Sequence, residues 1–483
     1  MADIDLVSVA RRVLEQNGFA TEPPAVEAQP AAVLGDDVRD LRSLPWSSID
    51  NVESRDLDQI EYVEKIGEDR VRVLVAIADV DAFVERGSPL DVFAATNTIS
   101  LYTGVRTFPM LPPELSNDRT SLLADRERLA VVTEMIVHRD GSLDDAATTV
   151  YRARVRNHAK LVYERVGAWL EGEQAATPSE PFIGEQLHLQ ARATTWLRQR
   201  RVEAGALELD TIEARPIAKD GRIVDLEVVR KNRAREIVED LMIAVNGATA
   251  RFLERRVSSS IRRVVRAPKR WDRIVELARV LGTDLPDTPS VHALGEFVAK
   301  QRHEDPERFH DFSLTIVKLL GPGEYILQRP TDPDQGHFGL AVDDYLHSTA
   351  PNRRYPDLVT QRLLKAAASG MQAPYMDDEL VSIAAHCTER ENAARKVERT
   401  LRKIFAASLL APRVGDTFDA IVTGVTHKGT FARLLRPPAE GRIVRGERGL
   451  DVGDRVKVKL VATDSERGFV DFEAIRGTVR DHD

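Results

Sequence analysis

IDNVESRDLDQ, residues 49 to 59, places four acidic side chains within eleven residues, directly before the strand-like run 60–66. Carboxylates this close repel one another, so a folded site needs a cation or a buried hydrogen-bond network to hold them. Asp56 and Asp58 are two residues apart, so in an extended segment both point to the same side. If the chain returns Asp50 to that side, the three carboxylates suit Mg²⁺ or Mn²⁺. The same stretch also fits a solvated acidic turn.

The composition of the whole chain is that of a globular protein. Its 483 residues are 42% hydrophobic and 30% charged, and this length accommodates about two to four domains. The single cysteine, Cys387, excludes an internal disulfide and a cysteine-built zinc site. No apolar run is long enough to cross a bilayer, and residues 1–18 lack the core of a signal peptide. We therefore expect a cytoplasmic protein with no membrane partner.

Charge is distributed unevenly along the chain. The net charge of −9 argues against a nonspecific binder of polyanions. Residues 251–273, however, carry nine lysines and arginines against only Glu254 and Asp272. Such a basic segment within an acidic protein fits a channel for a phosphate backbone, and it fits a solvated helix face equally well.

The hydrophobic pattern indicates an α+β protein with a small C-terminal barrel. Residues 1–40 read as a short helical element, with helical periodicity at 5–16, followed by a linker. Residues 41–410 read as a catalytic domain with a mixed or antiparallel sheet and packed helices, and residues 411–476 as a five-stranded barrel. The catalytic domain is expected to contain strands at 60–66, 71–80, 129–138 and 149–155 and helices at 88–96, 235–255, 357–368 and 378–410.

A second functional stretch precedes the expected helix 357–368. Arg353 and Arg354 lie just before this helix, whose first turn contains a proline. A helix N-terminus favours anions, and two guanidinium groups there can clamp a phosphate. Tyr355 offers a ring or a hydroxyl at the same place, and Arg362 lies about two turns further along. The same residues also suit a helix start with arginines paired to surface carboxylates.

A third candidate is His337, which lies between Gly336 and Gly339. These glycines let a ligand or another strand come close to the backbone. A lone histidine also commonly has a structural role, and the sequence leaves both interpretations open.

Five blocks of this sequence resemble the ribonuclease II / ribonuclease R (RNB) family and occur in the family's order. The acidic stretch resembles the family signature of an aspartate, five residues and then Asp-x-Asp-Asp. The tail 414–472 is similar to the S1 RNA-binding domain, an OB-type barrel in which Phe431 would stack on a base. The other blocks lie at 109–123, with MLPPELS and SLL, at 157–170, at 237–246, with IVEDLMIAVN, and at 337–355.

The resemblance implies a processive 3′→5′ exoribonuclease that hydrolyses single-stranded RNA to nucleoside 5′-monophosphates. The sequence leaves the oligomeric state open, but a channel formed by one polypeptide needs no partner subunit, so we expect a monomer; we expect no dinucleotide cofactor. Asp56, Asp58 and Arg353 would be catalytic. Mg²⁺ or Mn²⁺ would be held by Asp50, Asp56, Asp58 and Gln59, and the metal would activate the attacking water. The RNA would be bound by Tyr163, His337, Arg353, Arg354, Tyr355, Arg362 and Phe431.

Two departures from the family pattern change these expectations. Gln59 stands where the family usually has aspartate, and an amide offers a metal an oxygen but no charge. Weaker binding of one cation, an altered metal preference or loss of activity would follow. In addition, about 40 residues precede the catalytic domain, too few for one of the cold-shock barrels that bacterial relatives carry there. We therefore expect a less restricted entrance that tolerates base-paired RNA.

Two other functions remain open from the sequence. A catalytically impaired RNA-binding factor would keep the fold while Gln59 disables the chemistry. A small-molecule metallohydrolase would leave the C-terminal barrel and the basic segment unexplained. Because Asp50, Asp56, Asp58 and Arg353 are all present, the sequence favours the exoribonuclease.

Overall fold

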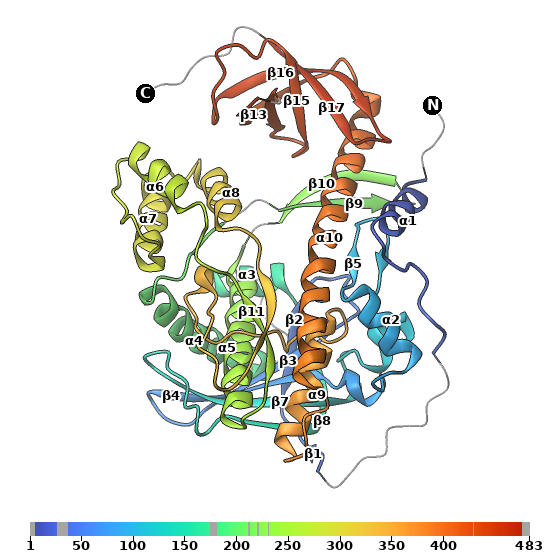
Figure 1. The fold of residues 1–483 in the computed structure, drawn as a ribbon, viewed down its shortest axis with the longest axis vertical. Coiled ribbons are helices and arrows are strands. Elements are labelled where there is room, and N and C mark those ends of the chain that lie inside the picture. Colours follow the sequence, from blue (N-terminus) through green and yellow to red (C-terminus); the bar gives the residue numbers. More distant parts are fainter. Residues whose placement is uncertain are drawn as a thin grey trace.

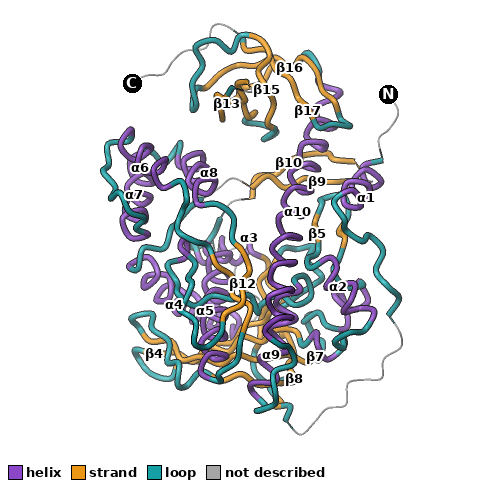
Figure 2. Tube along the Cα trace, viewed as in Figure 1, coloured by secondary structure: helices purple, strands orange, loops and turns teal. Residues whose placement is uncertain are grey.

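The computed structural model describes residues 5–26, 37–173, 181–210, 213–219, 222–229, 231–427 and 429–475. A body of strands and helices is joined by one long helix to a small barrel at the opposite end of the molecule (Figure 1). In Figure 2 several strands of the body lie at the lower end of the view, and others lie higher, toward the barrel. The expected α+β class is confirmed.

Five strands of the body form a sheet that closes on itself, which we call the main sheet. They are β2 (Trp46–Asp50), β3 (Gln59–Lys65), β4 (Arg70–Ala78), β7 (Glu127–His138) and β8 (Thr149–Val162). β8 pairs in parallel with β2 and antiparallel with β7, whereas the other neighbours in the order β2-β3-β4-β7 are antiparallel. The expected mixed sheet is therefore confirmed, with β1 (Arg39–Asp40) added in parallel to β8.

The main sheet is covered on both faces, which explains the nearly continuous apolar run in β4. Successive side chains of a strand point to opposite faces. The valines and isoleucine at odd positions 71–77 join a layer that includes α4 (Pro181–Glu203) and α5 (Arg233–Arg255). Leu74, Ala76 and Ala78 join a second layer that includes α9 (Tyr355–Ala368).

Local sequence accounts for the helices that flank the main sheet. The side chain of Asn232 caps α5 by accepting the N–H of Arg235, and α9 has a proline in its first turn, where a missing N–H costs nothing. The other helices of the body are α2 (Pro89–Asn97), α3 (Tyr163–Leu170), α6 (Trp271–Val280), α7 (Val291–Glu304) and α8 (Phe309–Leu320). Short helical turns lie at Val80–Ala82, Leu115–Arg119, Phe338–Leu340 and Ala411–Arg413.

The long helix α10 (Asp377–Leu410) connects the body to the barrel (Figure 1). Along its length it contacts the N-terminal helix α1 (Leu6–Gln16), strand β10 (Arg222–Val229) and the barrel. α1 buries one apolar face in the same hydrophobic cluster as α10. β10 forms a hairpin with β9 (Glu213–Lys219). Of the expected linker, residues 27–36 lie outside the described residues.

The C-terminal barrel is closed and five-stranded. Its strands are β13 (Thr417–Thr426), β14 (Gly429–Leu434), β15 (Glu440–Arg445), β16 (Arg455–Asp464) and β17 (Phe469–Ala474). Arg433 lies 2.9 Å from Asp311 and Arg455 lies 3.0 Å from Glu307, so the barrel is also tied to the region of α8. Two short ladders complete the fold: β5 (Leu101–Tyr102) with β6 (Thr107–Phe108), and β11 (Ser260–Val264) with β12 (Glu324–Gln328).

Among the described helices, none combines the length and the apolar character needed to cross a membrane.

Candidate active site

One large cavity, of about 1170 Å³, collects the acidic stretch and the Arg353 segment. Its wall is built from the loop before β3, the 102–117 segment, α3, α5, β9 and α10. Six of the residues expected to form the site line this cavity: Asp50, Asp56, Asp58, Gln59, Tyr163 and Arg353. The structure therefore brings the two stretches together, although about 300 residues separate them in sequence.

The acidic stretch is held in place through its backbone and its small side chains. Asp50 ends β2, and its Oδ1 accepts the N–H of Asn51 at 2.7 Å and the hydroxyl of Ser54 at 2.8 Å. Leu57 is buried, and its N–H donates to Ser121 Oγ at 3.0 Å. Because Leu57 anchors the loop on one side, its neighbours Asp56 and Asp58 reach the cavity.

Asp58 connects the two halves of the site. Its side chain is 2% exposed, its Oδ1 accepts the N–H of Asn352 at 2.9 Å, and its Oδ2 lies 3.5 Å from Nε of Arg353. Among the described residues, no hydrogen-bond donor reaches the buried Oδ2. Burial raises the pKa of Asp58 to about 7, although Arg353 and the Asn352 N–H act in the opposite direction. Asp58 is therefore a carboxylate for which an additional positive charge is favourable.

Arg353 and Arg354 have separate environments, so they do not form the expected pair of phosphate ligands. The Arg353 side chain is 44% exposed and lines the cavity. The Arg354 side chain is only 17% exposed, and its guanidinium donates to Asp357 Oδ1 at 2.7 Å and to Thr349 Oγ1 at 3.4 Å. Arg354 thus stabilises the first turn of α9 by bonding Thr349 before the helix and Asp357 inside it.

Tyr355 and Arg362 also lie outside the cavity wall, which corrects the expectation that they contact RNA. Tyr355 belongs to the hydrophobic core next to α9. Arg362 is buried and donates to Asp81 and Asp91, each at 2.8 Å, and to the Tyr375 hydroxyl at 2.7 Å. Its charge is already balanced by two carboxylates, so it stabilises the packing of α9 rather than binding phosphate.

Tyr163 begins α3 and presents its ring at the cavity wall. The guanidinium of Arg235 lies 4.3 Å from the centre of this ring and is itself held by Asn51 Oδ1 at 3.1 Å and Glu164 at 3.0 Å. Burial raises the pKa of Tyr163, and the nearby carboxylate of Asp50 acts in the same direction. A neutral, clamped aromatic ring of this kind is suited to stacking on a base.

His337 and Phe431 do not line the cavity. Nδ1 of His337 accepts the N–H of Leu340 at 3.2 Å, and its ring packs edge-on against Tyr345. Burial lowers the pKa of His337 to about 4, so the ring is neutral and has a structural role in its loop. Phe431 lies on β14 of the C-terminal barrel, where it pairs with Arg442 of β15.

Sequence reasoning missed three residues next to the cavity. The Tyr102 hydroxyl donates to Asp56 Oδ2, and Arg235 covers Tyr163. Glu61 is completely buried in β3. Burial, and to a smaller extent the nearby carboxylate of Asp50, raise the pKa of Glu61 to about 8. The alternation of Ile60 and Tyr62 with Gln59 and Glu61 places Glu61 on the polar side of the strand, so the sequence gives no signal of its burial.

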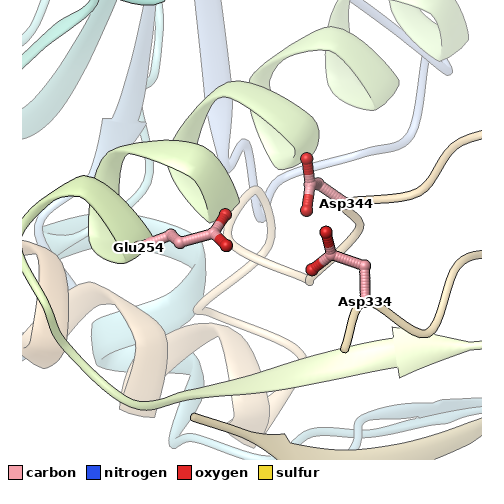
Figure 3. A group of neighbouring side chains, drawn as sticks. All are labelled: Glu254, Asp334 and Asp344. Atoms are coloured by element: carbon pink, nitrogen blue, oxygen red, sulfur yellow. The ribbon is translucent and has the colours of Figure 1, made fainter. Parts of the chain in front are cut away.

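A second acidic group lies away from the cavity and is shown in Figure 3. Glu254, Asp334 and Asp344, which we call the acidic triad, each place a carboxylate oxygen within 4.8 Å of the others, so the triad could hold a cation. Arg262, whose side chain is 4% exposed, lies 3.7 Å from both Glu254 and Asp344. The guanidinium therefore already supplies positive charge to this group.

Ion pairs with carboxylates also account for arginines of the basic segment 251–273. Arg251 contacts Asp145 at 2.8 Å, Arg263 contacts Glu391, and Arg273 contacts Glu276 at 2.8 Å. These arginines are engaged by carboxylates of the same chain, which favours the structural interpretation of the segment over a phosphate channel.

Comparisons with known proteins agree with this fold. Residues 38–370 match the RNB domain, and residues 416–475 match the RNase II-type exonuclease C-terminal S1 domain. Ribonuclease R of Escherichia coli (strain K12) is 30% identical over 478 residues; the match covers 90% of this chain, which spans 57% of the length of that protein.

Solved structures share the architecture at lower identity. Mycoplasma genitalium RNase R in complex with double-stranded RNA superposes with a TM-score of 0.84 at 23% identity, covering 98% of this chain and 83% of that one. Yeast Ssd1, a pseudonuclease, superposes with a TM-score of 0.71 at 16% identity, covering 96% of this chain and 58% of that one. The family match over most of the chain shows that this protein belongs to the RNB family and carries an RNase II-type S1 domain at its C-terminal end.

Proposed function

We propose that this protein is a processive, metal-dependent 3′→5′ exoribonuclease that hydrolyses single-stranded RNA to nucleoside 5′-monophosphates. The observation that carries the proposal is the position of Asp58, which accepts the Asn352 N–H and lies 3.5 Å from Arg353. This contact joins the acidic stretch to Arg353. Of Arg353, Arg354 and Arg362, only Arg353 is among the residues that line the described cavity wall. Carboxylates and an exposed guanidinium around one cavity suit a phosphodiester substrate.

The residues of the cavity fit a hard divalent cation. Their donors are all oxygens, from Asp50, Asp56, Asp58 and the Gln59 amide, and Asp58 has a buried oxygen without a hydrogen-bond donor among the described residues. Mg²⁺ and Mn²⁺ prefer such ligands. A bound cation would lower the pKa of water and neutralise charge that develops on the phosphate.

The remaining cavity residues have roles in positioning RNA. Arg353, exposed at the wall, binds a phosphate next to the scissile bond, while Asp58 keeps its guanidinium oriented. Tyr163, clamped by Arg235, stacks on a base near the 3′ end. Tyr102 orients Asp56 through its hydroxyl group. The S1 barrel supplies a second RNA contact through Phe431, and the protein acts as a monomer.

The decisive experiment uses RNA labelled at its 5′ end, with Mg²⁺ or Mn²⁺ in one arm and EDTA in the other. The expected result is stepwise shortening from the 3′ end with release of mononucleotides, and none of this in EDTA. A ladder that starts from the 5′ end, or internal cuts, would contradict the proposal.

A second candidate, an RNA-binding factor without catalysis, depends on Gln59 alone, which contributes no charge to the cation site; the family match supports the exoribonuclease instead. Yeast Ssd1 illustrates that this architecture also occurs in a pseudonuclease. Tight RNA binding without product under both metals would support this candidate and exclude the exoribonuclease.

Base-paired RNA is the finer part of the proposal. The M. genitalium relative has been solved in complex with double-stranded RNA, and we propose that this protein accepts such substrates as well. A duplex with a single-stranded 3′ overhang tests this: we expect degradation to continue into the paired region, whereas complete arrest at the edge of the duplex would refute tolerance of structure.

A further inference from the structure

Glu61 is the least compensated carboxylate of the main sheet. It lies in the middle of β3 with 0% of its surface exposed, and neither of its carboxylate oxygens has a hydrogen-bond partner among the described residues. Ser47 lies opposite Glu61 on β2, and its buried hydroxyl lacks a partner as well. Buried polar groups are nearly always satisfied in native proteins, so this exception needs an explanation.

Other buried carboxylates of this protein have their cations nearby. Asp79 lies 3.1 Å from Arg152 and 2.9 Å from Lys365, and Asp240 contacts both Arg198 and Arg201. Within the described part of the chain, no ion pair of this kind is found for Glu61. Asp79 and Asp240 therefore have positively charged side chains beside them, whereas Glu61 has none among the described residues.

The position of Glu61 relates it to the cavity. Gln59 and Glu61 are two residues apart on β3, so both side chains point to the same side of the strand, and Gln59 lines the cavity. The charged neighbour of Glu61 is Asp50, which also lines the cavity. Both hydrogen bonds that fix Asp50 end on its Oδ1, so its Oδ2 is available to a shared cation.

We propose that Glu61 supplies a carboxylate to the divalent-cation site of the cavity, together with Asp50, in place of the charge that Gln59 lacks. The inference rests on the proposed function, because it takes the cation of that site as given. A cation held between Asp50 and Glu61 satisfies the unpartnered oxygens and removes the repulsion between the two carboxylates. With Glu61, the site has the carboxylates of Asp50, Asp56 and Glu61 in addition to Asp58, even though residue 59 has an uncharged amide.

The test measures binding of Mn²⁺ itself, by the loss of the free-ion signal in electron paramagnetic resonance, on the full chain without RNA. Glu61→Gln keeps the size and removes the charge, and we expect it to weaken Mn²⁺ binding about tenfold or more. Glu61→Met is the second variant, because an apolar side chain suits this buried position if the amide does not fold. The matched control is Glu64→Gln, on the same strand but paired with Arg72 at the surface, which should bind as wild type.

A compensating variant separates a ligand from a packing residue. If Glu61 provides the missing charge, Gln59→Asp combined with Glu61→Gln restores Mn²⁺ affinity, because the carboxylate returns on the same side of β3. Because Gln59→Asp tightens binding by itself, the comparison is with Gln59→Asp alone: Glu61→Gln should cost less Mn²⁺ affinity in that background than in wild type, whereas a residue that only packs would cost the same in both. Failure of the rescue, or wild-type affinity in either Glu61 variant, would overturn the inference.

Asp50→Asn distinguishes this inference from the proposed function. If wild type binds Mn²⁺, and Asp50→Asn abolishes binding while Glu61→Gln does not, the cavity is a cation site and only the role of Glu61 is wrong. If wild type itself binds no Mn²⁺ in the cavity, the cation of the proposed function is wrong, and the inference falls with it.

Discussion

The cavity and the acidic triad are both rich in carboxylates, but they balance their charge differently. In the triad, Arg262 lies 3.7 Å from Glu254 and 3.7 Å from Asp344. In the cavity, Arg353 approaches Asp58 at 3.5 Å. Among the described residues, Asp50, Asp56 and the buried Glu61 have no ion pair of this kind.

This difference shows that a group of acidic side chains does not by itself indicate a metal site. The triad satisfies a purely geometric criterion for holding a cation, because its oxygens lie within 4.8 Å of one another. Its charge is nevertheless compensated from within the protein. Among the described residues, the cavity carboxylates have fewer ion-pair partners, so we expect an external cation to stabilise them more.

Asp58→Asn should produce the largest effect, because it removes the central charge of the cavity. The amide oxygen can still accept the Asn352 N–H, so the fold and RNA binding are retained. We expect RNA hydrolysis to fall by about 10³-fold or more. Single-turnover cleavage of labelled RNA measures the rate of hydrolysis, and filter binding measures RNA affinity as the control. Wild-type turnover in this variant would show that the roles are wrongly assigned.

Arg262→Met tests the triad by removing its internal cation. Breaking a buried ion pair on one side typically costs about 3–5 kcal/mol, so the free energy of unfolding should drop by this order. Mg²⁺ should then recover part of the loss, because three carboxylates remain. Urea denaturation with and without Mg²⁺ measures this.

The matched control for that experiment is Arg266→Met. Arg266 pairs with Glu324 at the surface, where an ion pair contributes little. If Mg²⁺ stabilises wild type and Arg262→Met equally, the triad does not exchange its guanidinium for a metal.

The pH dependence of the cation-free protein follows from the cavity carboxylates. Burial raises the pKa of Asp58 to about 7 and that of Glu61 to about 8, above the ordinary carboxyl values. The folded state therefore holds more protons than the unfolded state, so stability present near pH 4 is lost as pH rises toward 7–8. Between pH 6 and 8 we expect a loss of about 2–4 kcal/mol in EDTA.

Saturating Mn²⁺ should flatten this profile, because a bound cation favours the ionised carboxylates. Urea unfolding at each pH, compared between wild type and Glu61→Gln, isolates the cavity from the other titrating groups. An identical slope in the two proteins, with and without Mn²⁺, would contradict this origin of the pH dependence.

Gln59→Asp alone should have the smallest effect. It adds a carboxylate at the cavity wall, so Mn²⁺ binding should tighten roughly severalfold, while the cation-free protein becomes slightly less stable. Gln199→Asp, on the outer face of α4, adds the same charge far from the cavity and should leave the titration unchanged. An unchanged titration in Gln59→Asp would show that position 59 does not contact the cation.

Sequence patterns predicted the parts of the fold that depend on local periodicity. The apolar run of β4, the periodicity of α5 and α10, and the alternating strands of the barrel all appear near the expected positions. β8 could not be foreseen as the strand that closes the main sheet, because its pairing with both β2 and β7 is decided by tertiary packing.

The site was predictable where its chemistry is local, and not where it depends on distant partners. The spacing of Asp50, Asp56 and Asp58 identifies one group of cavity residues from the sequence itself. Helical spacing placed Arg362 next to Arg353, but carboxylates some 270 to 280 residues earlier in the chain bury and neutralise it. Tyr102 was missed for a similar reason, since its partner Asp56 lies in another segment.

The helix α10 gives the molecule a fixed internal spacing. Leu401 and Phe405 line the cavity, and β16 and β17 pack against the same helix, which ends at Leu410. Because a helix advances about 1.5 Å per residue, the number of residues between these two contacts sets their distance along the helix axis. An RNA strand bound both in the cavity and on the barrel would therefore span a constant distance. The number of nucleotides protected at the 3′ end would then be a property of the protein backbone and independent of base sequence.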